Sequence, residues 1–314
     1  MAPASIEVDI PVNVSATKAA FSTKPLRQSG ALDAFESFDP TPIIGREFPT
    51  ANIVDWLKAP NSDELIRDLA ITERDDQGDD HVVGYIHQKQ TKPSFLRNKD
   101  LAPDALCPKK QNTSEWHSDC CFEPVPADYS CLRLTTLPAT GGDTLWANGY
   151  DEPYQKFLET LTCTFEPPGL KQMCDAMGIK LYAKERGNPE NVGDVIKAVH
   201  PVVRTNPVTG WKSVFAIGGM VKHINGVTAE ESKMLIDWFH ELVYKNHTMQ
   251  VRFKWKDPND FAIWDNRSFY HSATYDFWEM GDRHGCRGSG VGEKPYLDPK
   301  SKSRREDLAD LGGY

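Results

Sequence analysis

The chain has 314 residues, of which 39% are hydrophobic and 26% charged, and this length suffices for one large domain with a complete core. Its net charge of -9 argues against a general affinity for nucleic acid, whose phosphates require clustered lysine and arginine. Because no apolar run approaches the roughly 18 residues of a membrane span, and the N-terminus lacks a secretion signal, we expect a cytoplasmic protein without membrane partners.

The N-terminal region is rich in Ala, Ser, Pro and Thr and is predicted to be an extended arm over residues 1–45. Residues 46–314 are then expected to form a single domain. Asn61, followed by Ser-Asp-Glu-Leu-Ile, predicts the start of a capped helix. The next predicted elements are strands over 130–136 and 144–146 and a short helix over 153–161.

The clearest helix is predicted to begin at Thr228, where Thr-Ala-Glu-Glu forms a capping box. Leu235, Phe239 and Val243 recur at helical spacing, together with Trp238 and Leu242. This apolar stripe predicts a helix that packs against the core.

Residues 250–255 alternate between apolar and polar, 257–260 predict a turn, and 261–264 predict a buried strand. We expect a hairpin that carries His271 towards the functional site. The whole pattern suits a mainly β fold with outer helices, namely a distorted double-stranded β-helix, which is a cupin-like relative of the jelly roll.

The seven cysteines lack the paired spacing of a zinc site or a disulfide framework, and we expect reduced thiols. They lie at positions 107, 120, 121, 131, 163, 174 and 286. Cys120 and Cys121 follow Asp119 directly. Since consecutive strand residues face opposite ways, at most one of them is expected to share the face of His117.

His117-Ser118-Asp119 is the most informative motif, together with His271 much further along the chain. In an extended strand the side chains of residues i and i+2 point the same way, so His117 and Asp119 can reach one metal ion. Two imidazoles and one carboxylate can occupy one face of an octahedral ferrous ion and leave three positions open. His271 is predicted to be the third ligand, which only a closed tertiary fold can bring alongside.

Further motifs surround these residues. Trp-Asp-Asn-Arg precedes His271 at 264–267, and Arg283 and Arg287 follow it by 12 and 16 residues. With Trp-His-Ser-Asp at 116–119 and Gly-Gly-Asp-Thr-Leu-Trp at 141–146, this order resembles the taurine and aryloxyalkanoate (TauD/TfdA-type) dioxygenase family of Fe(II)/2-oxoglutarate oxygenases. The resemblance extends from Trp116 to Pro295.

The resemblance implies specific roles for several residues. His117, Asp119 and His271 fall at the family's iron-ligand positions. Arg283 and Thr144 fall where the family holds the distal carboxylate of 2-oxoglutarate, which a guanidinium can grip with two hydrogen bonds. Alternatives remain: Arg283 in a surface ion pair with a neighbouring acidic residue, and Thr144 as an ordinary strand threonine.

Two more positions are implied to contact the primary substrate. Arg287 is the family's second arginine, and its neighbourhood from Gly285 to Gly290 is stripped of large side chains, which lets an anionic ligand approach closely. Phe215 matches a pocket aromatic. The alternatives are a structural arginine and a core phenylalanine. Trp264, Asp265 and Arg267 are expected to pack around the site or to orient a ligating histidine.

The expected cofactor is Fe(II), with 2-oxoglutarate and O2 as cosubstrates. The predicted reaction is hydroxylation of an unactivated C–H in a small anionic sulfonate, carboxylate or amino acid, with release of succinate and CO2. Desaturation or oxidative cyclisation in specialised metabolism uses the same site, and a zinc hydrolase or a non-catalytic binding protein are alternatives from other classes. The sequence does not indicate the oligomeric state.

The chain departs from the family pattern in two places. After Ile71, Thr-Glu-Arg-Asp-Asp replaces an expected apolar strand, and the stretch around Asp151 is short. If these gaps are real, the lid over the metal differs from that of relatives.

Overall fold

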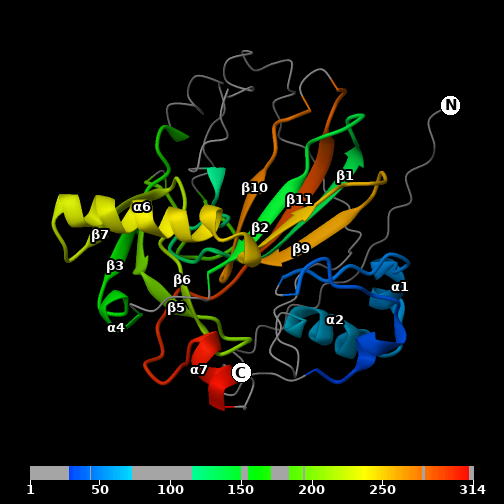
Figure 1. Cartoon of the computed structure of the whole chain (residues 1–314), viewed down its shortest axis with the longest axis horizontal. Coiled ribbons are helices and arrows are strands. Elements are labelled where there is room, and N and C mark those ends of the chain that lie inside the picture. The colour runs from blue at the N-terminus through cyan, green and yellow to red at the C-terminus, as the bar shows by residue number, and fades with distance from the viewer. Residues whose placement is uncertain are drawn as a thin grey trace.

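The computed structural model describes residues 28–42, 44–72, 115–149, 155–170, 184–193, 195–277 and 280–310. This part of the chain is mainly β, with helices on the outside (Figure 1). The strands are β1 (Ala127–Thr136), β2 (Thr144–Asn148), β3 (Thr162–Phe165), β4 (Ala198–Pro201), β5 (Val203–Thr205), β6 (Lys212–Val214), β7 (Val221–Asn225), β8 (Gln250–Phe253), β9 (Phe261–Asp265), β10 (Phe269–Ala273) and β11 (His284–Val291). The helices are η1 (Ala31–Ala34), α1 (Ile53–Lys58), α2 (Ser62–Ile71), α4 (Gln155–Leu158), α6 (Ala229–Lys245), η4 (His247–Met249) and α7 (Arg304–Asp310).

Two three-stranded antiparallel sheets form the centre of the molecule, in the orders β11-β1-β9 and β10-β2-β8. Apolar side chains from both sheets share one buried cluster. Trp146 of β2 and Trp264 of β9 meet there, with ring centroids 5.5 Å apart. The alternating strands therefore bury one face each in a common interior, as in sheet-on-sheet packing.

The expected hairpin over 250–264 is wrong, although both strands exist. β8 pairs with β2 and β9 pairs with β1, so the connection between them crosses from one sheet to the other. Both strands still bury their apolar faces in the same interior, but from opposite sides. Alternation and a turn signal are the same for a hairpin and for such a crossing, so the local pattern does not distinguish them.

A second body of structure packs beside these sheets. The sheet β4-β3-β7 and the pair β5-β6 lie next to α6, which contacts β7 (Figure 1). The predicted capping box is present: Thr228 Oγ1 accepts from the backbone N–H of Glu231, and the Glu231 carboxylate accepts from that of Thr228. Leu235, Phe239 and Val243 are buried, so the prediction of a packing helix is confirmed.

The predicted N-terminal arm is packed where the structure describes it. Leu32 joins the small core of α1 and α2, and Ile44 is buried in the cluster between the two central sheets. The buried Asp68 carboxylate accepts hydrogen bonds from Ser29 and from the backbone of Ala31. These contacts contradict the expectation of an unpacked arm for residues 28–42 and 44–45; residues 1–27 and 43 lie outside the described residues.

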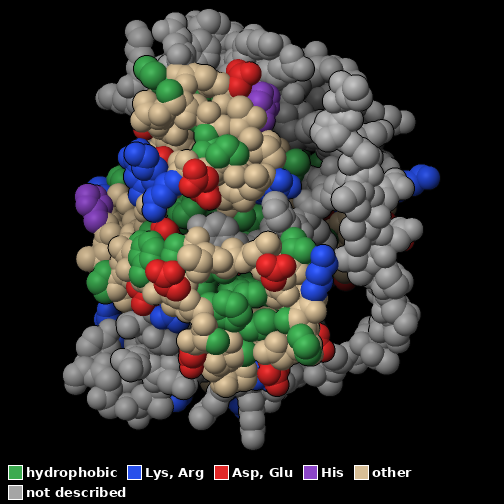
Figure 2. All heavy atoms as spheres, turned by 90° about the vertical axis from the view of Figure 1, so that its right-hand side faces the viewer, with side chains coloured by type: hydrophobic (Ala, Val, Ile, Leu, Met, Phe, Trp, Pro, Cys, Tyr) green, Lys and Arg blue, Asp and Glu red, His purple; other side chains and the backbone are tan. Residues whose placement is uncertain are grey.

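One face of the molecule, seen in Figure 2, carries acidic, basic and hydrophobic side chains side by side over its described part. No described helix combines the length and apolar character needed to cross a bilayer.

Candidate active site

His117 and His271 lie side by side because their backbones pair. The N–H of His117 donates to the carbonyl of His271 at 3.1 Å, and the N–H of His271 donates back at 3.0 Å. The ring centroids are 4.3 Å apart. Gly218 makes room for this approach: it has a φ of +113°, and a Cβ there would lie 2.7 Å from the carbonyl oxygen of Trp116.

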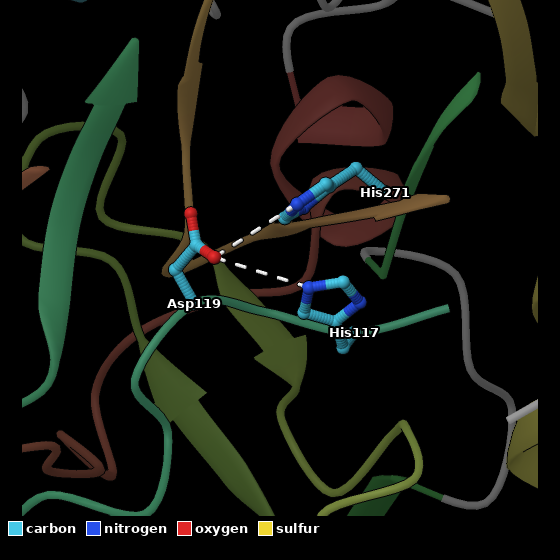
Figure 3. Close-up of side chains that lie close together, drawn as sticks. All are labelled: His117, Asp119 and His271. Atoms are coloured by element: carbon cyan, nitrogen blue, oxygen red, sulfur yellow. Dashed lines mark ion pairs between the residues drawn. The ribbon is translucent and has the colours of Figure 1, made fainter. Parts of the chain in front are cut away.

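Asp119 completes a three-residue cluster. Its Oδ1 lies 3.9 Å from Nε2 of His117 and 3.9 Å from Nε2 of His271 (Figure 3). One potential ligand atom from each residue lies within 4.8 Å of the others. The structure thus brings together the three predicted ligands.

The local geometry differs from the extended strand that the sequence suggested. His117 forms a β-bridge, but Asp119 lies in a turn, and Cys120 follows with a left-handed φ of +52°. The expectation that Cys120 and Cys121 alternate along a strand is therefore wrong. Burial raises the pKa of the Cys120 thiol to about 11, which disfavours the thiolate that binds metals.

The protonation states suit a metal ligand set. Burial, reinforced by His117, lowers the pKa of His271 to about 3, so its imidazole is neutral near pH 7. Burial by itself raises the pKa of Asp119. The opposing effect of its neighbours, His271 and Arg287 foremost, is larger, so the net shift of the pKa is downward and the carboxylate is ionised. A neutral imidazole and a carboxylate are the forms that bind a divalent metal.

The tautomer of His117 is set by a backbone group. Its Nδ1 lies 2.7 Å from the carbonyl oxygen of Glu115, which accepts a hydrogen bond from a protonated Nδ1. Nε2, on the side of Asp119, then keeps its lone pair for a metal. A backbone carbonyl thus orients the His117 ring, while Asp265, one of the residues expected to pack around the site or to orient a histidine, forms a buried ion pair with Arg267.

A cavity of about 850 Å³ opens beside the two histidines. Its wall includes Leu132 and Leu134 of β1, which share one face of that strand, as well as Trp264 and Tyr275. Leu132, Leu134 and Tyr275 were not predicted to line the site, although the i, i+2 spacing of the two leucines was a usable signal.

Arg283 and Thr144 meet in this cavity, as the resemblance implied. Arg283 Nε donates to the carbonyl of Gly142 at 2.9 Å, and Nη2 lies 3.4 Å from Thr144 Oγ1. The neighbouring Asp282 lies 3.7 Å from His284 instead of pairing with Arg283. The arginine therefore faces the cavity rather than a surface ion pair with that residue.

Arg287 also lines the cavity, at the end nearest the cluster. Its Nη1 donates to Asp119 Oδ1 at 2.6 Å, while about half of the side chain is exposed. A partly exposed guanidinium on β11 is available to anions that enter the cavity. The carboxylate that it meets in this structure is the predicted metal ligand itself.

Phe215 lies apart from the residues that line the cavity. It is 1% exposed and packs against Phe165 and His200, with the Arg204 guanidinium 4.8 Å from its ring centroid. This position favours the alternative of a core phenylalanine.

Comparison with known proteins adds to this geometry. A family model described as "Taurine catabolism dioxygenase TauD, TfdA family" matches residues 64–289. The chain belongs to this family. As a TauD, TfdA family member it is an alpha-ketoglutarate-dependent dioxygenase, a class that uses Fe(II), 2-oxoglutarate and O2.

Individual relatives of this TauD, TfdA family chain cover most of its length. The alpha-ketoglutarate-dependent dioxygenase btcD of Neocamarosporium betae is 44% identical, over 90% of this chain and 98% of that protein. That match extends over 336 positions, more than the 314 residues of this chain, so the relative contains residues that this chain lacks. The two places where the sequence departs from the family pattern fall largely in 73–114 and 150–154, outside the described residues.

Two further proteins show the range of the family. The alpha-ketoglutarate-dependent sulfonate dioxygenase of Saccharomyces cerevisiae is 29% identical, over 72% of this chain and 57% of that protein. A solved structure from Burkholderia xenovorans, which carries the name of an alpha-ketoglutarate-dependent taurine dioxygenase, matches with a TM-score of 0.60 and 22% identity. It covers 85% of this chain and 93% of that chain, and it shows that the fold is shared.

Proposed function

We propose that this dioxygenase oxidises an unactivated C–H bond of a small anionic organic molecule, with hydroxylation as the leading outcome and succinate and CO2 as coproducts. The observation that carries the proposal is the convergence of His117, Asp119 and His271 at the edge of a cavity that also holds Arg283. These three residues are assigned as the iron ligands. Bound Fe(II) would supply the activation of O2.

The chain's own residues position the cosubstrate. We assign Arg283 and Thr144 to the distal carboxylate of 2-oxoglutarate, because the guanidinium and the hydroxyl converge on one wall of the cavity. A planar guanidinium suits a carboxylate better than an ammonium does. A zinc hydrolase would have no use for this second anion site.

The primary substrate is assigned by charge. Among the described residues, Arg287 is the guanidinium that contacts the cluster, and it already binds a carboxylate, that of Asp119. An incoming sulfonate, carboxylate or amino acid would offer it a comparable acceptor. A sulfonate is supported by the name of the yeast relative. Phe215 lies too deep for direct contact in this structure, so its predicted role would require the core around it to rearrange.

The finer description of the fold is also a proposal. Two facing antiparallel sheets of three strands suit a distorted double-stranded β-helix, and we assign residues 46–314 to one such domain, with Leu32 and Ile44 of the preceding segment packed against described parts of it. A cytoplasmic location stays a prediction.

The decisive experiment measures succinate formed from 2-oxoglutarate in the presence of Fe(II), ascorbate and a panel of sulfonates, carboxylates and amino acids. At least one compound should stimulate succinate release, with replacement of Fe(II) by Zn(II) abolishing it. Mass spectrometry of the product distinguishes hydroxylation, which adds one oxygen, from desaturation or cyclisation, which each remove two hydrogens. Absence of any iron-dependent succinate, with or without the panel, would contradict the proposal.

A further inference from the structure

Asn266 lies in the turn between β9 and β10 and is 1% exposed. Its side-chain oxygen accepts hydrogen bonds from the backbone N–H of Asp119 and the indole N–H of Trp264, each at 3.0 Å. Its side-chain nitrogen donates to the carbonyl of Asp128 at 3.0 Å and to the Ser130 hydroxyl at 2.7 Å. Both ends of the amide are therefore fully used inside the protein.

The backbone of Asn266 holds the loop that contains Ser118 and Asp119 at a second point. Its carbonyl accepts from the Ser118 hydroxyl at 2.6 Å, and its N–H donates to the carbonyl of Asp128 at 2.7 Å. Ser118 and Asp119 are thus both tied to one residue. Since Asp119 lies in a turn, no strand ladder holds this part of the chain, and these hydrogen bonds take over that role.

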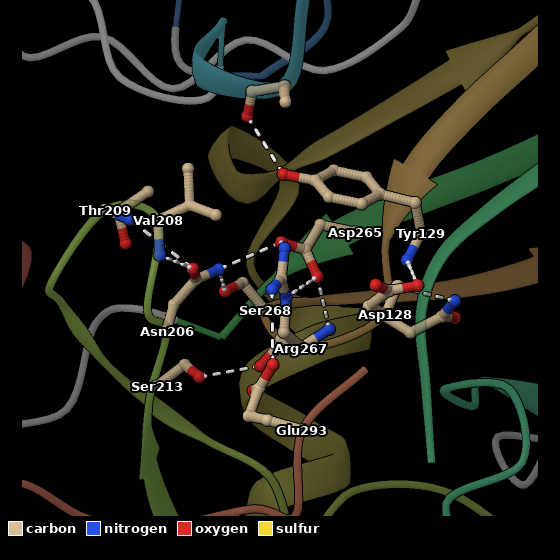
Figure 4. Close-up of polar contacts among 12 residues, drawn as sticks. Asp128, Tyr129, Asn206, Val208, Thr209, Ser213, Asp265, Arg267, Ser268 and Glu293 are labelled. Atoms are coloured by element: carbon tan, nitrogen blue, oxygen red, sulfur yellow. Dashed lines mark hydrogen bonds and ion pairs between the residues drawn. The ribbon is translucent and has the colours of Figure 1, made fainter. Parts of the chain in front are cut away.

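The turn that carries Asn266 is itself anchored. Asp265 and Arg267 flank Asn266 and form a buried ion pair, with Arg267 Nη2 2.6 Å from Asp265 Oδ2 (Figure 4). Asn206 donates to Asp265 Oδ2 at 3.0 Å and to Ser268 at 2.8 Å. Buried charges are tolerated when they are paired and hydrogen-bonded, and such networks rigidify the backbone around them.

We propose that Asn266 is a positioning residue for the metal centre, which sets the place of the Asp119 ligand loop relative to His271. This inference rests on the proposed function, because it takes Asp119 and His271 as ligands. Asn266 also orients Trp264, whose ring centroid lies 4.8 Å from that of His271. One amide thereby connects the backbone of the carboxylate ligand Asp119 to Trp264, which packs beside the histidine ligand His271.

The chemistry of the side chain explains why an amide is used. Asp119 N–H and Trp264 Nε1–H need an acceptor, whereas the Asp128 carbonyl and the Ser130 hydroxyl offer acceptors that need a donor. A neutral amide provides both at its two ends, and a carboxylate or a methyl group does not. Truncation would leave buried donors without partners, which favours displacement of the loop.

The test is a titration of metal-free protein with Co(II) alone, followed by the visible absorption of the bound ion. Asn266→Ala should raise the Kd for Co(II) by roughly 10- to 100-fold, as is usual when a residue supporting a metal ligand is lost. Asn191→Ala is the matched control. Asn191 is also 1% exposed, and its amide hydrogen-bonds to the backbones of Val125 and Arg186 rather than to that of Ser118 or Asp119. This control should lower the melting temperature without changing the Kd.

A Kd for Asn266→Ala equal to that of the wild type, or one that rises no more than in Asn191→Ala, would overturn the inference. If Asn266→Ala does not fold, Ser118→Ala removes one tie of the same brace and should raise the Kd several-fold; no change there also overturns it.

The proposed function fails separately. Asp119→Ala should abolish Co(II) binding, and if it binds as the wild type does, or if the wild type does not bind, the metal site is wrong and the inference falls with it. If the wild type binds, Asp119→Ala does not, and Asn266→Ala behaves as the wild type, only the role of Asn266 is refuted.

Discussion

Arg283 Nε donates to the carbonyl of Gly142 at 2.9 Å, and the Arg283 side chain packs directly over the position where Gly142 lacks a Cβ. A Cβ at position 142 would lie 2.9 Å from Cδ of Arg283. Gly142 also has a φ of +70°, and its N–H donates to Asp276 at 2.9 Å. The Gly-Gly turn therefore sets where the Arg283 guanidinium lies in the cavity.

Gly142→Ala should raise the KM for 2-oxoglutarate by roughly 10- to 100-fold, because displacement of a positioning group by about an ångström has effects of that size. Steady-state kinetics at saturating Fe(II) measure this. Gly169→Ala is the control: Gly169 has a similar φ of +71°, but a Cβ there would meet no atom within 4 Å. It carries the same backbone strain of about 1 kcal/mol without the contact. Equal KM values for the two variants would show that Gly142 does not place Arg283.

Arg287→Ala should raise the KM for the primary substrate by about 10- to 100-fold, the range expected for loss of a charge-assisted hydrogen bond. The KM for the cosubstrate 2-oxoglutarate should stay nearly unchanged at saturating metal. Arg283→Lys should show the opposite pattern, since an ammonium replaces a bidentate guanidinium. The measurement is succinate release with each substrate varied in turn. If Arg287→Ala raises both KM values equally, its assignment to the primary substrate is wrong.

Metal binding should stabilise the folded chain. Mn(II) at 100 times its Kd should add about 2.7 kcal/mol to the free energy of unfolding, and EDTA should reverse this. At the same Mn(II) concentration, Gly218→Ala should show a smaller Mn(II)-induced rise in melting temperature than the wild type. The reason is that a Cβ there meets the carbonyl of Trp116 and lies 3.1 Å from Cα of His117. Gly193→Ala, at φ +84° with open space around the position of a Cβ, should keep the full rise. A full Mn(II) response in Gly218→Ala would contradict this account of how His117 is placed.

The cluster could be predicted because residue type carries most of its information. Two histidines and an aspartate, each within a recognisable motif, indicate metal-binding chemistry whether they lie on strands or in turns. The structure brings His117, Asp119 and His271 together. Arg283 and Thr144, whose roles were implied by the family resemblance rather than by residue type, also meet in the cavity. The turn at Asp119 was missed because a His-x-Asp spacing is compatible with both a strand and a turn.

The errors share a physical origin in contacts that are distant along the chain. Strand alternation predicted β8 and β9 but not that they belong to different sheets, because partner choice depends on the whole interior. Asn266 belongs to the Trp-Asp-Asn-Arg motif, but the sequence predicted no role for it, since its role consists of hydrogen bonds to residues 118–130 that the motif does not reveal. The burial of Phe215 could not be predicted either, because an apolar residue type suits a core and a pocket wall equally well.

Buried His200 should make the folded state sensitive to acid. It is 2% exposed, its Nε2 lies 2.9 Å from the carbonyl oxygen of Glu123, and burial lowers its pKa from 6.5 to about 4. Between these pH values the unfolded chain binds the proton and the folded chain does not. The contribution of neutral His200 to the free energy of unfolding is therefore fully present above pH 6.5 and is lost as the pH falls towards 4.

At pH 5 the free energy of unfolding is lower by about 2 kcal/mol because His200 is protonated only in the unfolded chain. His200→Gln keeps a side-chain N–H donor for the Glu123 carbonyl but cannot titrate. Urea unfolding at pH 7.5, 6 and 5 should show the wild type losing about 2 kcal/mol more than His200→Gln. His223→Gln, at an exposed position on β7, controls for removal of a histidine as such. Parallel pH profiles for the wild type and His200→Gln would mean that His200 is protonated without cost in the folded state, which its buried contact with Glu123 argues against.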